Sequence, residues 1–461
     1  MEKRLIIVAL GLLVSLSLLW IFVIPPFQTP DEQAHLRYIQ FIAENKRLPN
    51  EEDISNNEIL ESSETIENLI EQTQADRIFH NRTYHFDFEN PEPTSIDGFN
   101  SAHIYNHPPL YYIWGAAIYL VFSTLGILKV LYLIRISNLV FVVFNFLYTY
   151  KTASFFSRNN WFKSVAAFLI SFWPALMFGN AGINSDVLLF TSFFAVTYYL
   201  IKIFKSPGLR QSDLVKLSLW SAAGLLSKAQ FLVFFPIVLQ VVVWKLRTNI
   251  SFKKIAAFAA PLILPLIYFV RNTFEFGGLF PDPSGNTGIV RDNYFRSESS
   301  CTGLSLFTYL RTLIYPRYAL IFKGFVGNFG WLDTQLPKII YILAGLVLLV
   351  GATAAVYWLA VSIKKKNFKI EHALLFAPVI NLELFYIYLF LKGYVYRCYE
   401  NFPTQGRYYF PMLLSFVLLL LLGFRSILPG RFRGIFYKGI IIAVLLFNSF
   451  CLAMIIERYC L

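Results

Sequence analysis

The chain has 461 residues, 56% of them hydrophobic, and a mean hydropathy of +0.53. Soluble domains have about 45–50% apolar residues, so this composition excludes an ordinary soluble protein. The net charge of +12 does not indicate nucleic-acid binding, because the charge is unevenly distributed. Residues 25–107 contain 16 of the 28 acidic residues and only five Lys or Arg, which leaves short basic clusters between apolar runs elsewhere.

The N-terminus predicts a membrane anchor. Lys3 and Arg4 precede an apolar run over 5–24, which is long enough to span a bilayer. No small-residue cleavage site follows, so we expect an uncleaved signal anchor with a cytoplasmic N-terminus.

Further apolar runs predict an all-α integral membrane protein with about eleven transmembrane helices. The segment 215–247 counts as two short crossings, because Ser227-Lys228-Ala229-Gln230 interrupts it. The predicted runs are 5–24, 130–150, 162–180, 186–204, 215–247, 255–270, 338–363, 371–392, 408–424 and 434–456. We expect one polytopic domain over 1–461, with large extracytoplasmic loops at 25–129 and 271–337.

Residues 109–127 are apolar enough to span, but the basic clusters argue against a crossing there. If this segment lies on the outer surface, every basic cluster faces the cytoplasm, as the positive-inside rule requires. The five later clusters lie in 151–163, 205–216, 245–254, 364–369 and 425–438. We therefore expect a juxtamembrane or re-entrant helix at 109–127.

With this topology, unusual polar residues collect at the outer face. In the first loop, Asp31 and Glu32 fall in the first turn of a helix, where the dipole favours acids. His35 lies four residues after Asp31 and shares its face, and Arg37 follows. The stretch from Glu44 to Glu71 is also acidic, and we favour a solvated helical insert over an acceptor site for it.

Other outer segments contribute single polar residues. His107 precedes a Pro pair at the end of the first loop, and Asn184 precedes Asp186 at the start of a helix. Lys228 interrupts an apolar run, and cations in membrane segments are costly and usually functional. The later outer segments add Trp331, Asp333, Gln335, Arg407 and Tyr408.

Each motif alone also fits an ordinary structural role, such as a helix cap, an interfacial aromatic residue or a solvated charge. Glu383, in the middle of a predicted helix, fits an internal ion pair or a transport pathway. Together, however, the outer groups suit sugar transfer from a membrane-bound phosphate. A carboxylate can activate an acceptor hydroxyl, and cations can hold the departing phosphate.

Six motifs, in order, resemble the bacterial membrane-protein family catalogued as DUF 2142. They are Pro-Asp-Glu-Gln-Ala-His at 30–35, His-Pro-Pro-Leu-Tyr-Tyr at 107–112, Asn-Ser-Asp-Val-Leu-Leu at 184–189, Leu-Leu-Ser-Lys at 225–228, Phe-Gly-Trp-Leu-Asp-Thr at 329–334 and Gln-Gly-Arg-Tyr at 405–408. The series is specific, although each motif alone is not. The family is similar to the GT-C glycosyltransferases, which include protein mannosyltransferases and lipid A aminoarabinose transferases.

The resemblance implies a GT-C-like fold, a polyprenyl-phosphate-sugar donor and transfer with inversion. Asp31 matches the first-loop acid and is the expected base, with Glu32 as the alternative, and Asp186 matches the second acid. Lys228 and Arg407 match phosphate contacts. Members of the superfamily differ in metal use, so a divalent metal is neither assigned nor excluded.

The resulting hypothesis is a multi-pass glycosyltransferase of the cytoplasmic membrane with an extracytoplasmic site. Its partners would be the lipid-linked donor, the bilayer and a glycan, lipid or protein acceptor of the cell envelope, and not nucleic acid. A transporter or flippase for lipid-linked saccharides and a non-catalytic assembly subunit stay open as alternatives. Cys301 and Cys398 both fall in expected outer segments, where either a disulfide or two free thiols fits.

Overall fold

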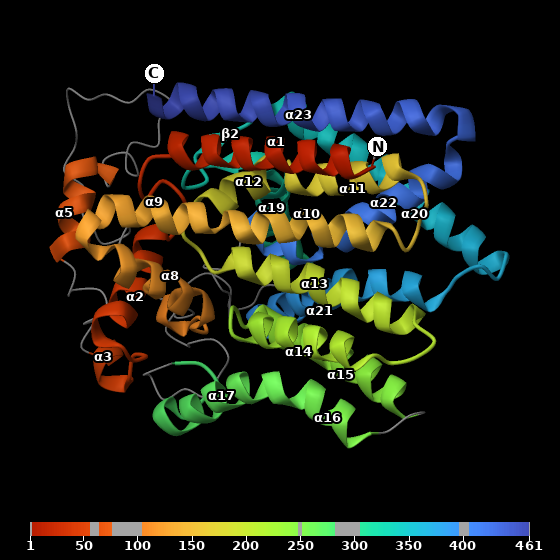
Figure 1. The fold of residues 1–461 in the computed structure, drawn as a ribbon. Helices are drawn as coiled ribbons and strands as arrows, with labels where there is room; N and C mark the ends of the chain where they lie inside the picture. The colour runs from red at the N-terminus through yellow and green to blue at the C-terminus, as the bar shows by residue number, and fades with distance from the viewer. Residues whose placement is uncertain are drawn as a thin grey trace.

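The computed structural model describes residues 2–55, 64–75, 104–247, 251–281, 305–395 and 405–460. Within these ranges the chain is a bundle of α-helices lying side by side, which confirms the prediction of an all-α membrane protein (Figure 1). The first helix begins at one end of the bundle and the last helix ends at the other (Figure 1). Cys301 and Cys398 lie outside the described ranges.

Among the described residues, eight helical spans are long and apolar enough to cross a membrane, or nine if one bent pair counts as a span. They comprise α1 (Glu2–Val23), α9 (Ile127–Ser137) with α10 (Leu139–Ala153), α13 (Asp186–Lys205), α16 (Phe252–Ala259) with α17 (Ile263–Phe276), α20 (Lys338–Lys364), α21 (Ile370–Val395), the 3-10 segment Gly406–Met412 with α22 (Leu413–Ile427), and α23 (Gly430–Cys460).

The predicted count of eleven crossings is not confirmed, and the difference lies in 215–247. The predicted break is present, because α14 (Gln211–Leu225) ends before Lys228 and α15 begins after it (Gln230–Leu246). These helices have 15 and 17 residues. At 1.5 Å per residue they reach about 22–26 Å, less than the ~30 Å hydrocarbon core.

The bent pair is α11 (Asn160–Ser171) and α12 (Pro174–Ala181), which meet at 52°. Pro174 explains the bend, because proline has no N–H to donate to the preceding turn and its ring pushes the preceding residue, Trp173, into an extended conformation. The bend places the end of α12, and the loop that follows it, beside the segment after α1.

The described part of the first loop is helical and lies at one end of the bundle (Figure 1). It contains α2 (Glu32–Asn45), α3 (Glu51–Ser55), α5 (Glu64–Thr73) and α8 (Leu110–Phe122). The helix α8 packs on α2, which agrees with a helix belonging to the loop. In the acidic stretch, α5 buries Ile66, Leu69 and Ile70, so part of that stretch is anchored to the bundle.

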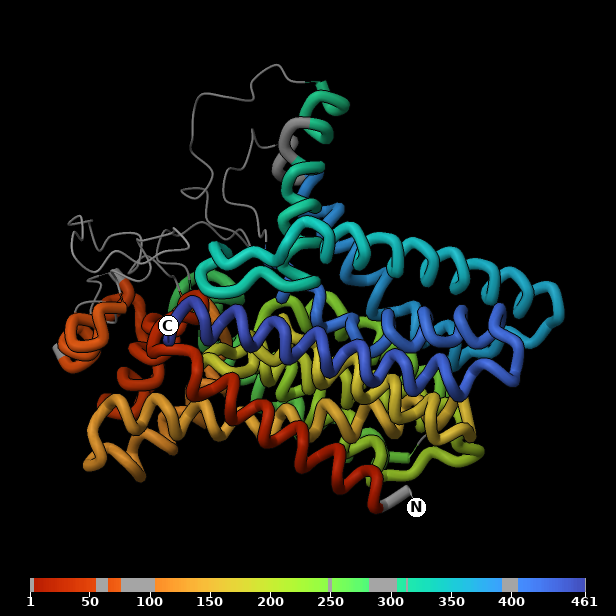
Figure 2. Tube along the Cα trace, turned by 90° about the horizontal axis from the view of Figure 1, so that it is seen from above, coloured from red at the N-terminus to blue at the C-terminus, as the bar shows by residue number. Residues whose placement is uncertain are grey.

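The predicted second loop, 271–337, contains helices that the sequence pattern did not indicate. These are α18 (Leu306–Tyr309), a π-helical turn over 310–314 and α19 (Tyr315–Gly327), which project from the bundle (Figure 2). A two-stranded antiparallel hairpin follows, with β1 (Asn328–Phe329) paired to β2 (Thr334–Gln335).

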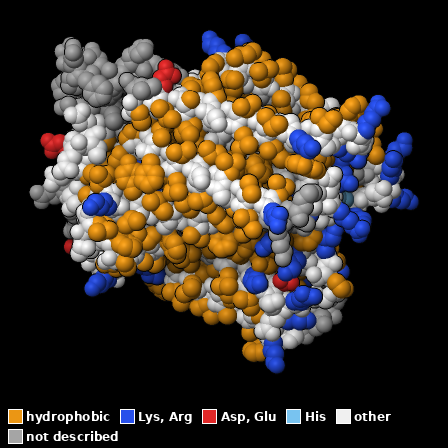
Figure 3. All heavy atoms as spheres, turned by 45° about the horizontal axis from the view of Figure 1, so that its top comes forward, with side chains coloured by type: hydrophobic (Ala, Val, Ile, Leu, Met, Phe, Trp, Pro, Cys, Tyr) orange, Lys and Arg blue, Asp and Glu red, His pale blue; other side chains and the backbone are white. Residues whose placement is uncertain are grey.

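Surface charge is unevenly placed on the described molecule. A broad hydrophobic surface covers its middle, and Lys and Arg gather at the end opposite the first loop (Figure 3). The turns joining α10 to α11, α13 to α14 and α20 to α21 lie at that end (Figure 1). Three of the basic clusters therefore share one end of the bundle, as the positive-inside argument expects, and the orientation itself stays a prediction.

Close packing of α20 on α22 depends on glycine. A Cβ at Gly423 would overlap the backbone of Ala354 and Ala355, so the two helices can approach only because this side chain is absent. In contrast, Gly439 in α23 has no heavy atom within 4 Å of a Cβ position.

We expect Gly423→Val to lower the thermal unfolding midpoint of the purified protein, because the added methyl groups force α20 away from α22. Overpacking of this kind costs on the order of 1–3 kcal/mol. The matched control is Gly439→Val, which carries the same propensity penalty in an open position. Equal midpoints for the two variants would contradict the proposed close packing.

Candidate functional site

Two acids and two cations from distant parts of the sequence meet at the end of the bundle that contains the first loop. We call Asp31, Asp186, Lys228 and Arg407 the charged cluster. Arg407 Nη2 donates to Asp31 Oδ2 at 2.6 Å, and Lys228 Nζ donates to Asp186 Oδ1 at 2.6 Å. Arg407 Nε lies 3.6 Å from Asp186 Oδ2, so the four charges form one alternating chain.

Asp31 occupies an unusual backbone position. Its φ of 68° is left-handed, at the residue that precedes α2, and its side chain makes no capping bond there. This region costs an L-residue roughly 1–2 kcal/mol, and Asp and Asn tolerate it best. The conformation leaves the Asp31 side chain 26% exposed, whereas that of Asp186 is 4% exposed.

Asp186 is positioned by the start of α13. The Asn184 side chain accepts a hydrogen bond from the Asp186 backbone N–H and donates another to the Gly179 carbonyl. This fixes the loop after α12. Asn184 is not a regular N-cap, because its side chain bonds the first residue of α13 and not the second or third.

The cations come from two helix starts. Lys228 lies in the break between α14 and α15, and Arg407 lies in the 3-10 segment before α22. Both approach the ring of Tyr408, at 5.1 Å for Lys228 Nζ and 5.6 Å for the Arg407 guanidinium carbon. The aromatic face adds cation–π attraction to the ion pairs.

His35 and His107 flank the cluster and share one tyrosine. The Tyr112 hydroxyl is 2.8 Å from His35 Nδ1 and 3.1 Å from His107 Nδ1. Burial raises the pKa of Tyr112, so its hydroxyl keeps its single proton. It can then donate to only one imidazole and must accept from the other, and so one histidine carries its proton on Nδ1 and the other on Nε2.

Both imidazoles are held neutral. Burial lowers the pKa of His35 well below its usual value, and His107, Arg407 and Lys228 lower it further. Burial, followed by the charge of Lys228, lowers the pKa of His107 to about 3, although Asp186 acts in the opposite direction. The pair therefore offers neutral donors and acceptors near physiological pH.

Glu32 lies next to Asp31 in sequence but not in the charged cluster. Its side chain is fully buried and forms a two-bond ion pair with Arg135, at 2.7 Å and 2.6 Å. Arg37 also points elsewhere, because its buried guanidinium lies 3.7 Å from Glu67 of α5. Of Asp31 and Glu32, only Asp31 contacts a cation of the charged cluster.

The hairpin residues expected at the site hold other partners. Trp331 Nε1 donates to a backbone carbonyl of the loop after α1, at 3.0 Å. Asp333 pairs with Arg458 of α23, and Gln335 accepts from Lys323 of α19 at 3.1 Å. The hairpin thus ties the first loop to α19 and α23.

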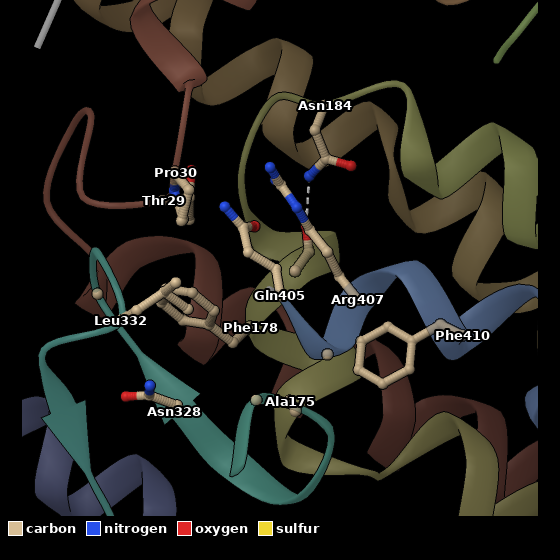
Figure 4. Close-up of a pocket in the computed structure, with 14 residues that line it drawn as sticks. Thr29, Pro30, Ala175, Phe178, Asn184, Asn328, Leu332, Gln405, Arg407 and Phe410 are labelled. Carbon is tan, nitrogen blue, oxygen red and sulfur yellow. Dashed lines mark hydrogen bonds between the residues drawn. The ribbon is translucent and has the colours of Figure 1, made fainter. Parts of the chain in front are cut away.

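A cavity of about 40 Å³ lies beside the charged cluster. Gln405 and Arg407 point into it together, opposite Thr29 and below Asn184 (Figure 4). Thr29 Oγ1 and Arg407 Nε are buried without a hydrogen-bond partner, and so is Asp186 Oδ2. Unsatisfied buried polar atoms are uncommon in folded proteins, and here two of the three belong to residues that line the cavity, Thr29 and Arg407.

A second hollow is an apolar groove of about 720 Å³ between α19, α20, α22 and α23. Adjacent residues of α19 line the two hollows, with Gly324 at the polar cavity and Phe325 at the groove. Phe325 also packs on Phe410 of the polar cavity, with ring centroids 5.8 Å apart. The polar and apolar hollows therefore adjoin.

No group of three or more His, Cys, Asp or Glu side chains within the described ranges is arranged to hold a metal ion. In the charged cluster each carboxylate already faces at least one cationic side chain.

Thr29 and Gln405, which line the cavity, were not among the predicted site residues, and neither were Arg135 and Tyr112, which support the site. Arg135 is a cation within an apolar run, which is the signal that singled out Lys228, and the same criterion would have found it. Tyr112 belongs to the His-Pro-Pro motif, but nothing in the spacing indicated that its hydroxyl would join two histidines 72 residues apart.

No curated protein matches. Among solved structures, the crystal structure of ArnT from Cupriavidus metallidurans in the apo state is similar with a TM-score of 0.34 and 13% identity, over 77% of this chain and 64% of that one. The chain therefore spans less than two thirds of that protein's length.

The profile of a family described as a predicted membrane protein, DUF2142, matches residues 14–416, which include all four members of the charged cluster. Since the match covers most of the sequence, this chain belongs to the DUF2142 family of membrane proteins.

Proposed function

We propose that this protein is a membrane glycosyltransferase that moves a sugar from a polyprenyl-phosphate donor to an extracytoplasmic acceptor. The observation that carries the proposal is the charged cluster, which places two cations and two acids beside a polar cavity that adjoins an apolar groove. The groove suits an isoprenoid chain, and the cations suit its phosphate. The acceptor is a glycan, lipid or protein.

In the proposed reaction, Asp31 is the general base. It takes the proton of the acceptor hydroxyl as that oxygen attacks the anomeric carbon from the side opposite the phosphate. The bond between the anomeric carbon and the phosphate oxygen breaks, and the lipid phosphate leaves with the electron pair. The configuration at the anomeric carbon is inverted, and Asp31 is the better candidate because it is the more exposed acid.

Arg407 and Lys228 would hold the leaving phosphate. Arginine suits this role because its planar guanidinium presents several donors in a fixed fork, and Arg407 Nε makes no hydrogen bond. A phosphate at Arg407 would compete with Asp31 for the guanidinium. Donor binding would therefore release the Asp31 carboxylate from its ion pair at the moment when a base is required.

Asp186 would keep both cations in place, since it contacts Lys228 and lies near Arg407. His35 and His107, neutral and linked through Tyr112, would supply hydrogen bonds to sugar or acceptor hydroxyl groups.

A flippase would instead need polar groups along the translocation path near the bilayer midplane. The clustering of these groups at one end of the bundle favours a transferase.

We expect Asp31→Asn to reduce sugar transfer by about 10²–10⁴-fold, because it removes the base and keeps a residue that tolerates the left-handed backbone. Asp186→Asn should also reduce transfer, because it releases the cations. The assay is transfer from a polyprenyl-phosphate-sugar by the purified protein. Asp213→Asn is the matched control, since it breaks the Lys202 pair at the opposite end. Full transfer by both cluster variants would refute the proposal.

Arg407→Gln should raise the KM for the lipid-phosphate donor by at least about tenfold, because it removes a charge-assisted contact to phosphate. Its effect on the acceptor KM should be smaller. Arg425→Gln serves as control, because Arg425 donates to the Phe156 carbonyl at the other end of α22. An unchanged donor KM in Arg407→Gln would remove this residue from the phosphate site.

The neutral histidines predict a pH dependence of stability. An unfolded histidine gains its proton near pH 6.5, but the folded His107 gains it only near its lowered pKa of about 3. The unfolded state therefore binds more protons between those values, and stability falls as pH drops from about 6.5 to 3, by up to about 1.4 kcal/mol per pH unit. Thermal midpoints measured against pH should show a shallower fall in His107→Asn, and equal slopes would contradict this assignment.

A further inference from the structure

Arg135 is a buried arginine at the end of α9, and the hydrogen bonds that it donates converge on the end of α1 and the start of the first loop. Its Nη1 donates to the carbonyls of Ile21 and Ile24, at 3.2 Å and 2.7 Å. Its Nη2 donates to the Pro25 carbonyl at 3.0 Å, and Nε and Nη2 hold Glu32. Arg135 thus joins the last turn of α1 to the first turn of α2.

Glu32 extends this junction to a third segment. Its Oε2 accepts the backbone N–H of Phe27 at 2.8 Å, and its Oε1 accepts the backbone N–H of Ile183 at 2.9 Å. Ile183 lies in the loop that leads to Asp186. One buried carboxylate therefore links the segment that carries Asp31 to the segment that carries Asp186.

The two segments also touch directly. A Cβ at Gly182 would overlap the Thr29 side chain, so the loop before α13 lies against the loop before α2. Phe27 and Asp31 in that loop both have left-handed backbones, with φ of 65° and 68°. Such conformations persist only where the surrounding contacts fix them, and the bonds to Glu32 and Arg135 flank both residues.

Stability alone is a poor explanation for this ion pair. Buried pairs often contribute little net stability compared with apolar residues of similar volume, because both charges lose their hydration. The pair instead fixes the relative positions of three segments, since its bonds reach the end of α1 and the two segments that carry Asp31 and Asp186. Beyond each other, the two side chains bond five backbone groups in fixed directions.

We propose that Arg135 and Glu32 are a positioning pair that sets the separation of Asp31 and Asp186 around Arg407. The inference rests on the proposed function for its catalytic consequence. Neither residue touches the cavity. Glu32 is therefore assigned here to positioning and not to the role of base that the sequence left open to it.

The test compares Arg135→Lys with Arg425→Lys. Lysine keeps the charge at 135 but cannot reach Glu32 and three carbonyls together. The control makes the same change in another arginine that donates to a backbone carbonyl, far from the site. A displacement of about 1 Å in a catalytic group can cost on the order of 100-fold in rate. We therefore expect kcat of Arg135→Lys to fall by roughly that factor, with the donor KM within threefold of wild type.

A second measurement does not depend on activity. Hydrogen exchange should accelerate together in peptides covering 21–34 and 179–187 of Arg135→Lys, because both lose their shared anchor. Exchange in a peptide covering 202–216 should stay unchanged. If Arg135→Lys does not fold, Glu32→Gln replaces it, because the amide keeps the shape of the side chain but presents N–H groups to the donors around it.

Wild-type kcat in the positioning variant, or a fall in kcat no larger than that of Arg425→Lys, would overturn the inference. Wild-type exchange in both peptides would also overturn it, as would a donor KM that rises in proportion to the loss of rate. A wild-type protein that transfers no sugar would instead refute the proposed function. In that case the exchange data alone decide whether the pair couples the two segments.

Discussion

Arg407 lies between two carboxylates, and the arrangement of the whole site follows from the cost of burying its charge. A buried guanidinium is tolerable only when acids compensate for its lost hydration, and Asp31 and Asp186 do so from segments 155 residues apart in sequence. Lys228 then balances the second acid. Since none of these residues is well placed without the others, the four segments that carry them are mutually fixed.

Irregularities in the helices around the charged cluster bring its four residues together. The bend at Pro174 directs the end of α12 toward the loop after α1, and the break at Lys228 exposes a cation between two short helices. A straight α11–α12 helix would carry Asn184 away from Arg407. The irregular elements are therefore the ones that build the site, whereas the regular spans support it.

Much of this arrangement was predictable from the sequence, because hydropathy and charge position report directly on the bilayer. The apolar runs are helical, the break near Lys228 is present, and four of the polar residues predicted at the outer face meet in one cluster. The count of crossings was less predictable, because α14 and α15 are too short for length to settle whether each spans.

The sequence did not predict which acid pairs with which cation, because that depends on the directions in which the side chains point in the folded protein. Asp31 and Glu32 are adjacent acids, yet one faces Arg407 and the other faces Arg135, 103 residues away. In the same way, Asp333 belongs with Arg458 and not with the charged cluster. A single sequence shows which residues are charged, but tertiary packing decides which of them form ion pairs.

The left-handed backbone at Asp31 explains why the motif reads aspartate and then glutamate. That conformation admits Gly, Asn and Asp far more readily than longer side chains, and aspartate alone among the three carries a charge. The next position is already helical and must reach across to α9, which requires the extra methylene of glutamate. The order of the two acids is thus a consequence of backbone shape and reach, and the reversed dipeptide would satisfy neither position.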